Sequence, residues 1–408
     1  MMGSKKRVAV IWLMVMALVA TLFAACGGDG GANGDKTVIT IGLMTDITGP
    51  AGGPCQPFGW AVEDIVRYTN EEEPIPGAEL RVVTYDTAYD PSRDIPGYEW
   101  LKSKGAKIII TPLPPTADTL KPFAEPDKVP VMIQSAAEGA LDPPGWVFAW
   151  APPTAEIIQP LIKYLGDNWT ESRKIKIGAT GWALPYGIDL TRGIREYCQA
   201  HADKFDYVGD YLAPMGTLTW SGEIAKLKDC DYISIPATGM GPPSFVKQAR
   251  DSGYAGAFVS TDAVGGYVDL MVNKVGWPIL DGLMTAYTTL YWNAPVASIE
   301  AAKDALDKWR AGEKSRIIAT GTGYSSAWTS STFWLDILRR AVETVGAENF
   351  DGRAFFDAAI EAHITLEGYR EAGYSPSKRY ALNDIVLYRW TAADEDLIQV
   401  GGWLPLVD

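Results

Sequence analysis

Short apolar runs alternate with helix-like segments along most of this 408-residue chain, and this alternation constrains the fold more than any other feature. The first run, residues 38–44, is rich in β-branched side chains and breaks into a polar, turn-forming loop at residues 45–55. Helices between short buried strands imply parallel pairing through right-handed crossovers. We therefore expect an α/β fold of doubly wound parallel sheets, with a ligand site near this first loop.

The alternation occurs as two series of similar size. Pro-rich chain at residues 142–145 and 151–154 separates them, which indicates two lobes. The expected strands are 38–44, 79–85, 107–110, 129–133, 174–179, 207–213, 232–235 and 257–260. The expected helices are 58–68, 92–104, 116–124, 155–165, 186–201, 221–228, 243–252 and 267–274.

The last third of the chain breaks this pattern. A strand-like run at 283–292 precedes three helical stretches, 298–310, 325–345 and 352–362, with little chain between them. We expect these helices to pack on the first lobe, because they have no partner strands. The aromatic residues of the 325–345 segment follow a three-to-four spacing, which favours a core role over a stacking platform. Residues 383–390 and 397–403 predict a closing hairpin.

The N-terminus has the features of an export signal. Three basic residues at 5–7 precede an apolar run at 8–23, which is short for a membrane span. Cys26 follows two alanines, and the segment resembles a bacterial lipoprotein signal. This resemblance implies removal of residues 1–25, a lipid on Cys26, a flexible tether at 26–36 and anchoring at the extracytoplasmic face of the membrane. An uncleaved anchor is the alternative, and it also exports the chain.

Charge and cysteine content narrow the functional classes. The formal charge is −14, and residues 1–25 carry three bases and no acids, so their removal leaves −17. So acidic a protein is a poor candidate for binding nucleic acid or for electrostatic docking to anionic lipid. Besides Cys26 the chain has Cys55, Cys198 and Cys230. Either Cys198 pairs with Cys230 or all three are buried thiols, and spacing alone does not decide between these.

Signatures of catalysis and of metal binding are missing from the sequence. The two histidines, His201 and His363, have no cysteines or acids at ligand spacing nearby. No Gly-x-Ser-x-Gly elbow and no phosphate-binding loop occurs. Asp86 and Asp90 are spaced like a carboxylate pair, but Asp90 precedes Pro and Ser at a helix start and is predicted to be a cap. We expect neither an enzyme nor a cofactor or metal.

Several short segments recur in the order seen in one receptor family. They are residues 42–50, Tyr85-Asp86-Thr87-Ala88-Tyr89-Asp90-Pro91, Ile110-Thr111-Pro112-Leu113, Ile133-Gln134-Ser135-Ala136-Ala137, Tyr186-Gly187 and Thr261-Asp262. Together they resemble the type I periplasmic binding proteins, specifically the branched-chain amino acid and amide receptors of ABC importers. The resemblance covers about residue 36 to the C-terminus.

This resemblance implies a fold and a function. The fold is two α/β lobes joined by a three-crossing hinge, with lobe 1 at residues 37–153 and 289–384 and lobe 2 at 154–288 and 385–408. The function is to bind a small amphipathic ligand, an amino acid, amide or amine, between the lobes and to deliver it to the permease subunits. The alternative is a sensor of the same fold that reports to a signalling partner; both need only ligand-linked closure.

Ligand residues in the first lobe follow position by position. Where the family carries a Ser that holds the ligand carboxylate, this chain has Pro114 and Pro115, with Thr116 next. Ser135 and Ala136 match the family loop after the fourth strand. The resemblance therefore implies contacts from Thr116, Ser135 and Ala136 but removes the usual carboxylate contact.

The remaining implied contacts are acids and aromatics. Glu138 stands where a Thr would receive the ligand ammonium; its alternative is a solvent-facing side chain. Tyr186, with Trp182 beside it, matches the aromatic that covers the ligand, and Thr238 matches a further lining position. Asp262 matches the acid that pairs with the ammonium; its alternative is a helix cap. An acid in a closed cleft needs a cation or donors, so we expect a ligand nitrogen near Asp262.

Overall fold

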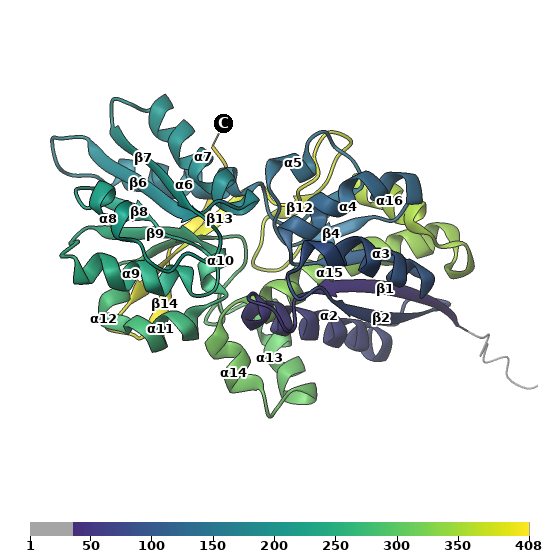
Figure 1. The fold of residues 1–408 in the computed structure, drawn as a ribbon. Helices are drawn as coiled ribbons and strands as arrows, with labels where there is room; N and C mark the ends of the chain where they lie inside the picture. The colour runs from purple at the N-terminus through teal and green to yellow at the C-terminus, as the bar shows by residue number, and fades with distance from the viewer. Residues whose placement is uncertain (1–35, 408) are drawn as a thin grey trace, which may run out of the picture. The chain divides into compact units, whose positions relative to one another are not determined.

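The computed structural model describes residues 36–407, which form two α/β lobes, each built on one sheet (Figure 1). The signal at residues 1–25, Cys26 and most of the predicted tether lie outside the described residues. Among the helices of residues 36–407, none combines the length and the apolar character needed to cross a membrane.

Lobe 1 contains a parallel five-stranded sheet in the order β2-β1-β3-β4-β5. Its strands are β1 (Thr37–Thr45), β2 (Ala78–Asp86), β3 (Ala106–Thr111), β4 (Val131–Ile133) and β5 (Val147–Ala149). The connecting helices are α2 (Gly52–Glu72), η1 (Pro91–Arg93), α3 (Asp94–Ser103), α4 (Pro114–Asp127) and α5 (Glu138–Leu141). In β3, Ile108 and Ile110 join one apolar cluster and Ile109 another. Both sheet faces are therefore covered, as the continuous apolar runs predict.

Lobe 2 contains a seven-stranded sheet in the order β14-β13-β10-β9-β8-β6-β7. Strands β6 (Ile175–Trp182), β7 (Phe205–Ala213), β8 (Tyr232–Ser234), β9 (Ala257–Thr261) and β10 (Met284–Tyr287) are parallel, and β13 (Asp384–Thr391) and β14 (Asp396–Pro405) add an antiparallel edge. The helices are α6 (Thr154–Asp167), α7 (Pro185–Ala200), α8 (Ser221–Leu227), α9 (Gly241–Asp251), α10 (Asp262–Gly265), α11 (Val268–Val275) and α12 (Trp277–Leu280). The fold class predicted from the sequence is confirmed.

The chain after β10 returns to lobe 1, as expected for helices without partner strands. It forms α13 (Ala297–Trp309), α14 (Lys314–Thr320), α15 (Gly323–Val345), η2 (Ala347–Asn349), α16 (Gly352–Ile360) and the hairpin β11 (His363–Thr365) and β12 (Glu371–Gly373). Helix α15 packs against α2, which is far away in sequence (Figure 1). Fully buried Asp64 on α2 joins them: it accepts hydrogen bonds from Arg310 (2.9 Å) and Tyr324 (3.1 Å).

Three connections run between the two sheets: from β5 to α6, from β10 to α13, and from Tyr380 into β13. Tyr380 starts at lobe 1, because it forms a β-bridge with Ala149, the last residue of β5. The three connections are hydrogen-bonded to one another. The Trp150 indole donates to the Thr288 carbonyl at 3.1 Å, and the Trp150 carbonyl accepts from the Leu382 amide at 3.2 Å. Trp150, itself fully buried, therefore ties the three crossings together. The exact lobe boundaries given above stay a prediction.

Several details differ from the sequence-based expectations. Helix α2 begins at Gly52 rather than at residue 58. Its first turn tolerates Pro54, because the amide hydrogen that proline lacks would have had no partner within the helix at that position. The Pro-rich break contains a strand, β5, and the expected strand at 283–292 ends at Tyr287. Asp90 caps η1, as predicted, by accepting from the Ser92 amide at 2.9 Å.

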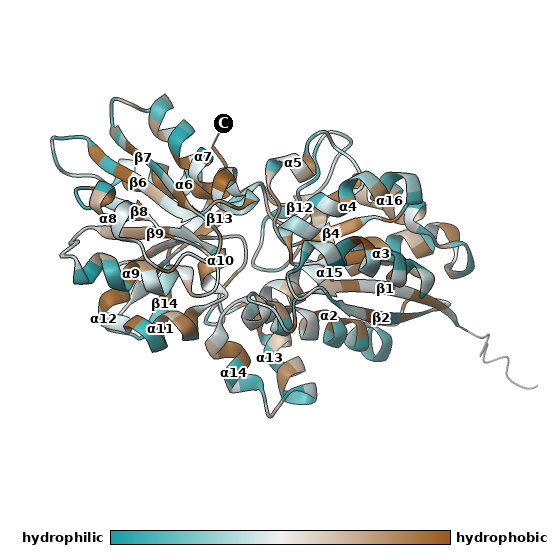
Figure 2. Cartoon of the chain, viewed as in Figure 1, coloured by the Kyte–Doolittle hydropathy of each residue, from teal (hydrophilic) through white to brown (hydrophobic). Residues whose placement is uncertain are grey.

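Apolar and hydrophilic residues are interspersed along the covering helices, as expected for helices with one buried face (Figure 2). The three cysteines within residues 36–407 are buried free thiols. The structure therefore favours buried thiols over the Cys198–Cys230 disulfide. Burial raises the pKa of each thiol to about 12, so these cysteines are not poised as nucleophiles.

Candidate ligand-binding site

A cavity of about 170 Å³ lies at the carboxyl ends of the parallel strands, where both lobes contribute loops. This is the place where open α/β sheets bind ligands. An engineered apolar cavity of about 150 Å³ holds benzene, so the size suits a small molecule. The lining residues are Ala51, Pro54, Cys55, Phe58, Tyr89, Pro112, Leu113, Pro114, Gln134, Ser135, Tyr186, Ala237, Thr238, Asp262, Ala263, Gly266, Tyr267, Thr289, Thr322, Gly323 and Ser326.

Two buried or half-buried carboxylates fix the loops of lobe 1 that line the cavity. Asp46, fully buried after β1, accepts from the amides of Gly49 (2.5 Å) and Ala51 (2.7 Å). Asp86, at the end of β2, accepts from the Ile47 amide (2.9 Å) on the first loop and from the Ala88 amide (2.9 Å) on its own loop. The two loops are therefore held together before any ligand binds.

The second of these loops brings Tyr89 to the cavity. Ala88 and Tyr89 have φ angles of +50° and +56°, a left-handed conformation that non-glycine residues rarely adopt. The hydrogen bond from the Ala88 amide to Asp86, and one from the Tyr89 amide to the Thr87 hydroxyl at 3.2 Å, hold this conformation. Burial, together with the nearby Cys55 and Asp46, raises the pKa of Tyr89 to about 12, so its phenol stays protonated and can donate.

Asp262 is the one charged side chain among the lining residues. Its Oδ2 atom accepts from the amide (3.2 Å) and the hydroxyl (2.5 Å) of Thr288, which follows β10. Burial raises the pKa of Asp262, against the opposing effect of the Thr288 hydrogen bonds. The cap of α10 is instead Thr261, whose hydroxyl accepts from the Ala263 amide, so Asp262 is not needed as the helix cap.

Two tyrosines of lobe 2 form much of the remaining wall. The Tyr186 hydroxyl, at the start of α7, makes a short hydrogen bond with the Thr261 hydroxyl, which positions the ring beside Asp262. Tyr267, just before α11, is buried, and burial raises its pKa well above the ordinary value. Both phenols stay protonated and act as polar, uncharged groups.

Polar atoms without partners face this region. Gln134 Oε1, Ser135 Oγ and Thr289 Oγ1 are buried and have no hydrogen-bond partner within the described chain. Buried polar atoms usually have a partner, so a ligand or water is expected to complete them. Pro112 and Pro114 line the same wall and have no amide hydrogen to offer a carboxylate. The cavity thus has several acceptors, neutral hydroxyl groups and no basic side chain.

Four of the eight residues predicted for ligand binding line the cavity: Ser135, Tyr186, Thr238 and Asp262. The other four do not. Thr116 donates to Asp94 at 3.0 Å beneath the surface, and Ala136 is buried in an apolar cluster of lobe 1. The Trp182 indole donates to the Thr217 carbonyl at 3.0 Å, beside the cavity rather than in it.

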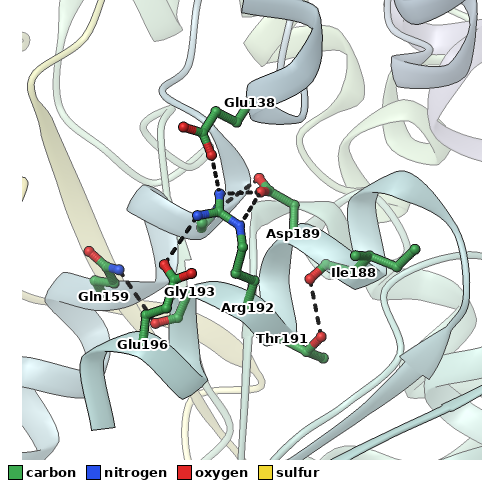
Figure 3. A network of polar contacts seen from close by, with 9 residues as sticks. Glu138, Gln159, Ile188, Asp189, Thr191, Arg192, Gly193 and Glu196 are labelled. Carbon is green, nitrogen blue, oxygen red and sulfur yellow. Dashed lines mark hydrogen bonds and ion pairs between the residues drawn. The ribbon is translucent and has the colours of Figure 1, made fainter. Parts of the chain in front are cut away.

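Glu138, the remaining predicted residue, belongs to an ion-pair network between the lobes (Figure 3). Its Oε2 atom lies 2.7 Å from Nη2 of Arg192 on α7, and Arg192 also pairs with Asp189 and Glu196 of its own helix. Asp189 is 6% exposed and accepts from the Ala155 amide at 3.0 Å, at the start of α6. Glu138 is thus engaged with a protein cation, outside the cavity lining.

The sequence-based prediction missed several lining residues, notably Tyr89, Tyr267, Gln134 and Thr289. Tyr89 and Gln134 stand inside segments that carried the family resemblance, which was the available signal. Tyr267 and Thr289 had no such signal, because their position depends on how α11 and the second crossing pack.

The arrangement offers binding groups rather than reactive ones. Cys55 lines the cavity as a protonated thiol whose pKa burial raises to about 12. Within residues 36–407, no cluster of three His, Cys, Asp or Glu side chains is arranged to hold a metal ion. Hydrogen bonding, one carboxylate and aromatic surface are what the cavity provides.

A family model described as "Periplasmic binding protein" matches residues 38–395. No curated protein matches the sequence. Solved structures similar to this chain include a branched-chain amino acid ABC transporter protein from Thermus thermophilus with bound valine (TM-score 0.79, 17% identity, 91% of this chain and 97% of that one). A solute-binding protein from R. palustris in complex with 4-hydroxybenzoate has TM-score 0.75, 17% identity and coverage of 90% and 97%. A fatty acid ABC transporter substrate-binding protein from Thermomonospora curvata has TM-score 0.75, 16% identity and coverage of 93% and 95%.

Proposed function

This chain belongs to the periplasmic binding protein family and is a solute-binding receptor of the ABC-transporter type, and we propose that its ligand is a small nitrogen compound. We propose an amine, an amide or an amino acid, bound between the lobes and delivered to a permease. Family membership implies an extracytoplasmic location and a binding protein rather than an enzyme.

The observation that carries the proposal is the charge of the cavity. Asp262 is its one charged lining residue, and no Lys, Arg or His stands among the lining residues. A carboxylate in a closed cleft is stabilised by a cation or by several donors, and Thr288 supplies donors to Oδ2 only. A ligand ammonium or amide N–H at Oδ1 would complete the site. Gln134 Oε1, an acceptor without a partner, favours the same donor-rich ligand.

The start of helix α15 bears on ligands that carry a carboxylate. The prolines of the lobe 1 wall cannot donate to one, but α15 begins at the cavity with Gly323, and the first amides of a helix attract anions. A side chain at Gly323 would come within 2.5 Å of the Pro54 carbonyl, so this close approach requires glycine. Amino acids therefore stay in the proposed class, beside amines and amides.

A thermal-shift series tests this function. Amines, amides, amino acids and the matching carboxylic acids are added to the protein, because a ligand that binds only the folded state raises the unfolding midpoint. We expect shifts from nitrogen compounds and none from purely anionic acids. Asp262→Asn keeps the shape and removes the charge; losing a buried charge pair costs ~3–5 kcal/mol, so affinity for a cationic ligand should fall by about a hundredfold or more. Asp251→Asn is the control, because Asp251 is exposed on α9 and lines neither the cavity nor the neighbouring groove. Near-normal affinity in Asp262→Asn, or tight binding of a plain acid, would refute the proposal.

We further propose that Cys26 anchors the receptor through a lipid, as the lipoprotein-like signal implies. Cys26→Ser should move the protein from the membrane fraction to the soluble fraction of fractionated cells. A wild-type protein that mass spectrometry finds with an unmodified Cys26 would contradict this.

A further inference from the structure

A larger groove adjoins the ligand cavity. The groove has a volume of about 510 Å³ and shares Tyr89, Thr238 and Tyr267 with the cavity. Because three residues line both spaces, the groove lies directly beside the cavity, and a ligand too long for the cavity would meet the groove next.

The lining of the groove is unusually apolar for an exposed site. It includes Trp182, Leu184, Met215, Leu218 and Met240. Met215, Leu218 and Met240 are 48%, 45% and 38% exposed, which makes them three of the nine exposed large apolar residues among residues 36–407. A third of those exposed apolar side chains therefore gather in this one groove, and such patches mark binding sites.

The charged residues of the groove do not compensate for this apolar lining. Arg316 is one of its lining residues, but its guanidinium pairs with Glu313 at 2.7 Å. Asp269 is half-buried, and burial raises its pKa. The two flexible methionines suit a partner whose shape varies, because their side chains adapt to different apolar groups.

We propose that this groove binds an apolar arm, alkyl or aromatic, of the same ligand whose nitrogen meets Asp262. The ligand class is then an amphipathic amine or amide too long for the cavity of about 170 Å³ alone. The inference rests on the proposed function for the nitrogen end of the ligand. The apolar arm has its own evidence in the groove lining.

Two probes test binding of the apolar arm in the groove independently of the nitrogen contact with Asp262. The first is a series of linear primary amines from propylamine to nonylamine, titrated by calorimetry. Each methylene that enters the groove should tighten binding by roughly threefold to fourfold. The second probe is N-phenyl-1-naphthylamine, an uncharged dye whose fluorescence rises in apolar sites and which does not depend on a charge pair with Asp262.

The test variant is the double substitution Met215→Ser, Leu218→Ser, and the matched control is Ile398→Ser, which alters a side chain of similar exposure (40%) on β14. Both sites are exposed, so folding should survive, and circular dichroism and the thermal midpoint check this. We expect the groove variant to weaken nonylamine and dye binding by about tenfold while changing propylamine binding less than about twofold. The control should bind all probes like the wild type.

The outcomes distinguish the two proposals. If no amine binds but the dye does, and the groove variant weakens the dye, the apolar arm is supported and the nitrogen partner of Asp262 is refuted. If affinity does not change with chain length, or if dye binding is the same in the groove variant and the wild type, the inference is overturned. Unchanged dye binding in the groove variant is also the result expected if the groove serves a protein partner.

Discussion

Replacing Glu138 by Gln should weaken ligand binding by a small, measurable factor. The Glu138–Arg192 ion pair joins α5 of lobe 1 to α7 of lobe 2 at 2.7 Å (Figure 3). Separation of the lobes would break this ion pair. The pair therefore stabilises the conformation in which both lobes line the cavity. A ligand that requires this conformation binds less tightly when the conformation is less populated.

The size of the effect follows from the surroundings of the pair. The side chains of Glu138 and Arg192 are 55% and 28% exposed, so solvent screens their attraction, and such pairs contribute ~0.2–1 kcal/mol. When the lobes separate, Arg192 retains its ion pairs with Asp189 and Glu196, because both acids lie on the same helix as Arg192. Glu138→Gln should therefore weaken binding by about 1.5-fold to 5-fold.

Calorimetry with the tightest compound of the thermal-shift series measures this change. The control is Glu196→Gln, which removes a carboxylate of similar exposure (50%) from the same guanidinium without affecting the contact between lobes. The difference between Glu138→Gln and wild type should shrink at about 1 M salt, where charges are screened beyond about 3 Å. Equal weakening by both variants, or a salt-independent effect, would refute the assignment of this pair to lobe closure.

Three further predictions concern single groups. Because burial raises the pKa of Asp262, binding of a cationic ligand should weaken as the pH falls through that raised pKa, and Asp262→Asn should abolish this dependence in a calorimetric pH series. The folding stability of the ligand-free protein should change with pH in the opposite direction. Because the pKa of Asp262 is raised in the folded state, its contribution to stability is present at low pH and is lost as the pH rises through that pKa. Arg310→Leu leaves Asp64 buried without its cation and should lower the unfolding free energy in urea by ~3–5 kcal/mol, whereas Arg340→Leu, which breaks an exposed pair, should cost less than about 1 kcal/mol. The three buried cysteines should resist iodoacetamide in the native protein and react after denaturation, as read by mass spectrometry; a peptide with a Cys198–Cys230 disulfide would contradict this.

Much of the fold could be predicted from the sequence, because its long elements carry their own signal. The β-branched run of β1 and the apolar spacing of α15 indicate their structure locally. Strand β5 and the hairpin β11–β12 have three residues per strand and were missed. Such short strands carry little sequence pattern of their own and form because a neighbouring strand pairs with them, β4 with β5 and β11 with β12.

The site was less predictable. Asp262 and Tyr186 came from the family resemblance, which fixes positions at strand ends and helix starts. Tyr89 reaches the cavity through two consecutive left-handed residues, a conformation that depends on Asp86 and on the neighbouring loop. Glu138 matched a ligand position in sequence, but Arg192 of the other lobe engages it in the folded chain. Contacts that depend on both lobes are not encoded in any one segment.

The hydrogen bonds of Asp262 connect the cavity to the crossings between the lobes. The carboxylate that lines the cavity holds Thr288, and the Thr288 carbonyl holds Trp150, which ties the three crossings together. If a cation at Asp262 shifts the equilibrium between open and closed lobes, a substitution at Thr288 that shifts the same equilibrium would change the affinity for that cation. Thr288 itself is not among the cavity-lining residues. Two receptors with identical binding cavities could therefore differ in affinity through a hinge residue that no ligand contacts.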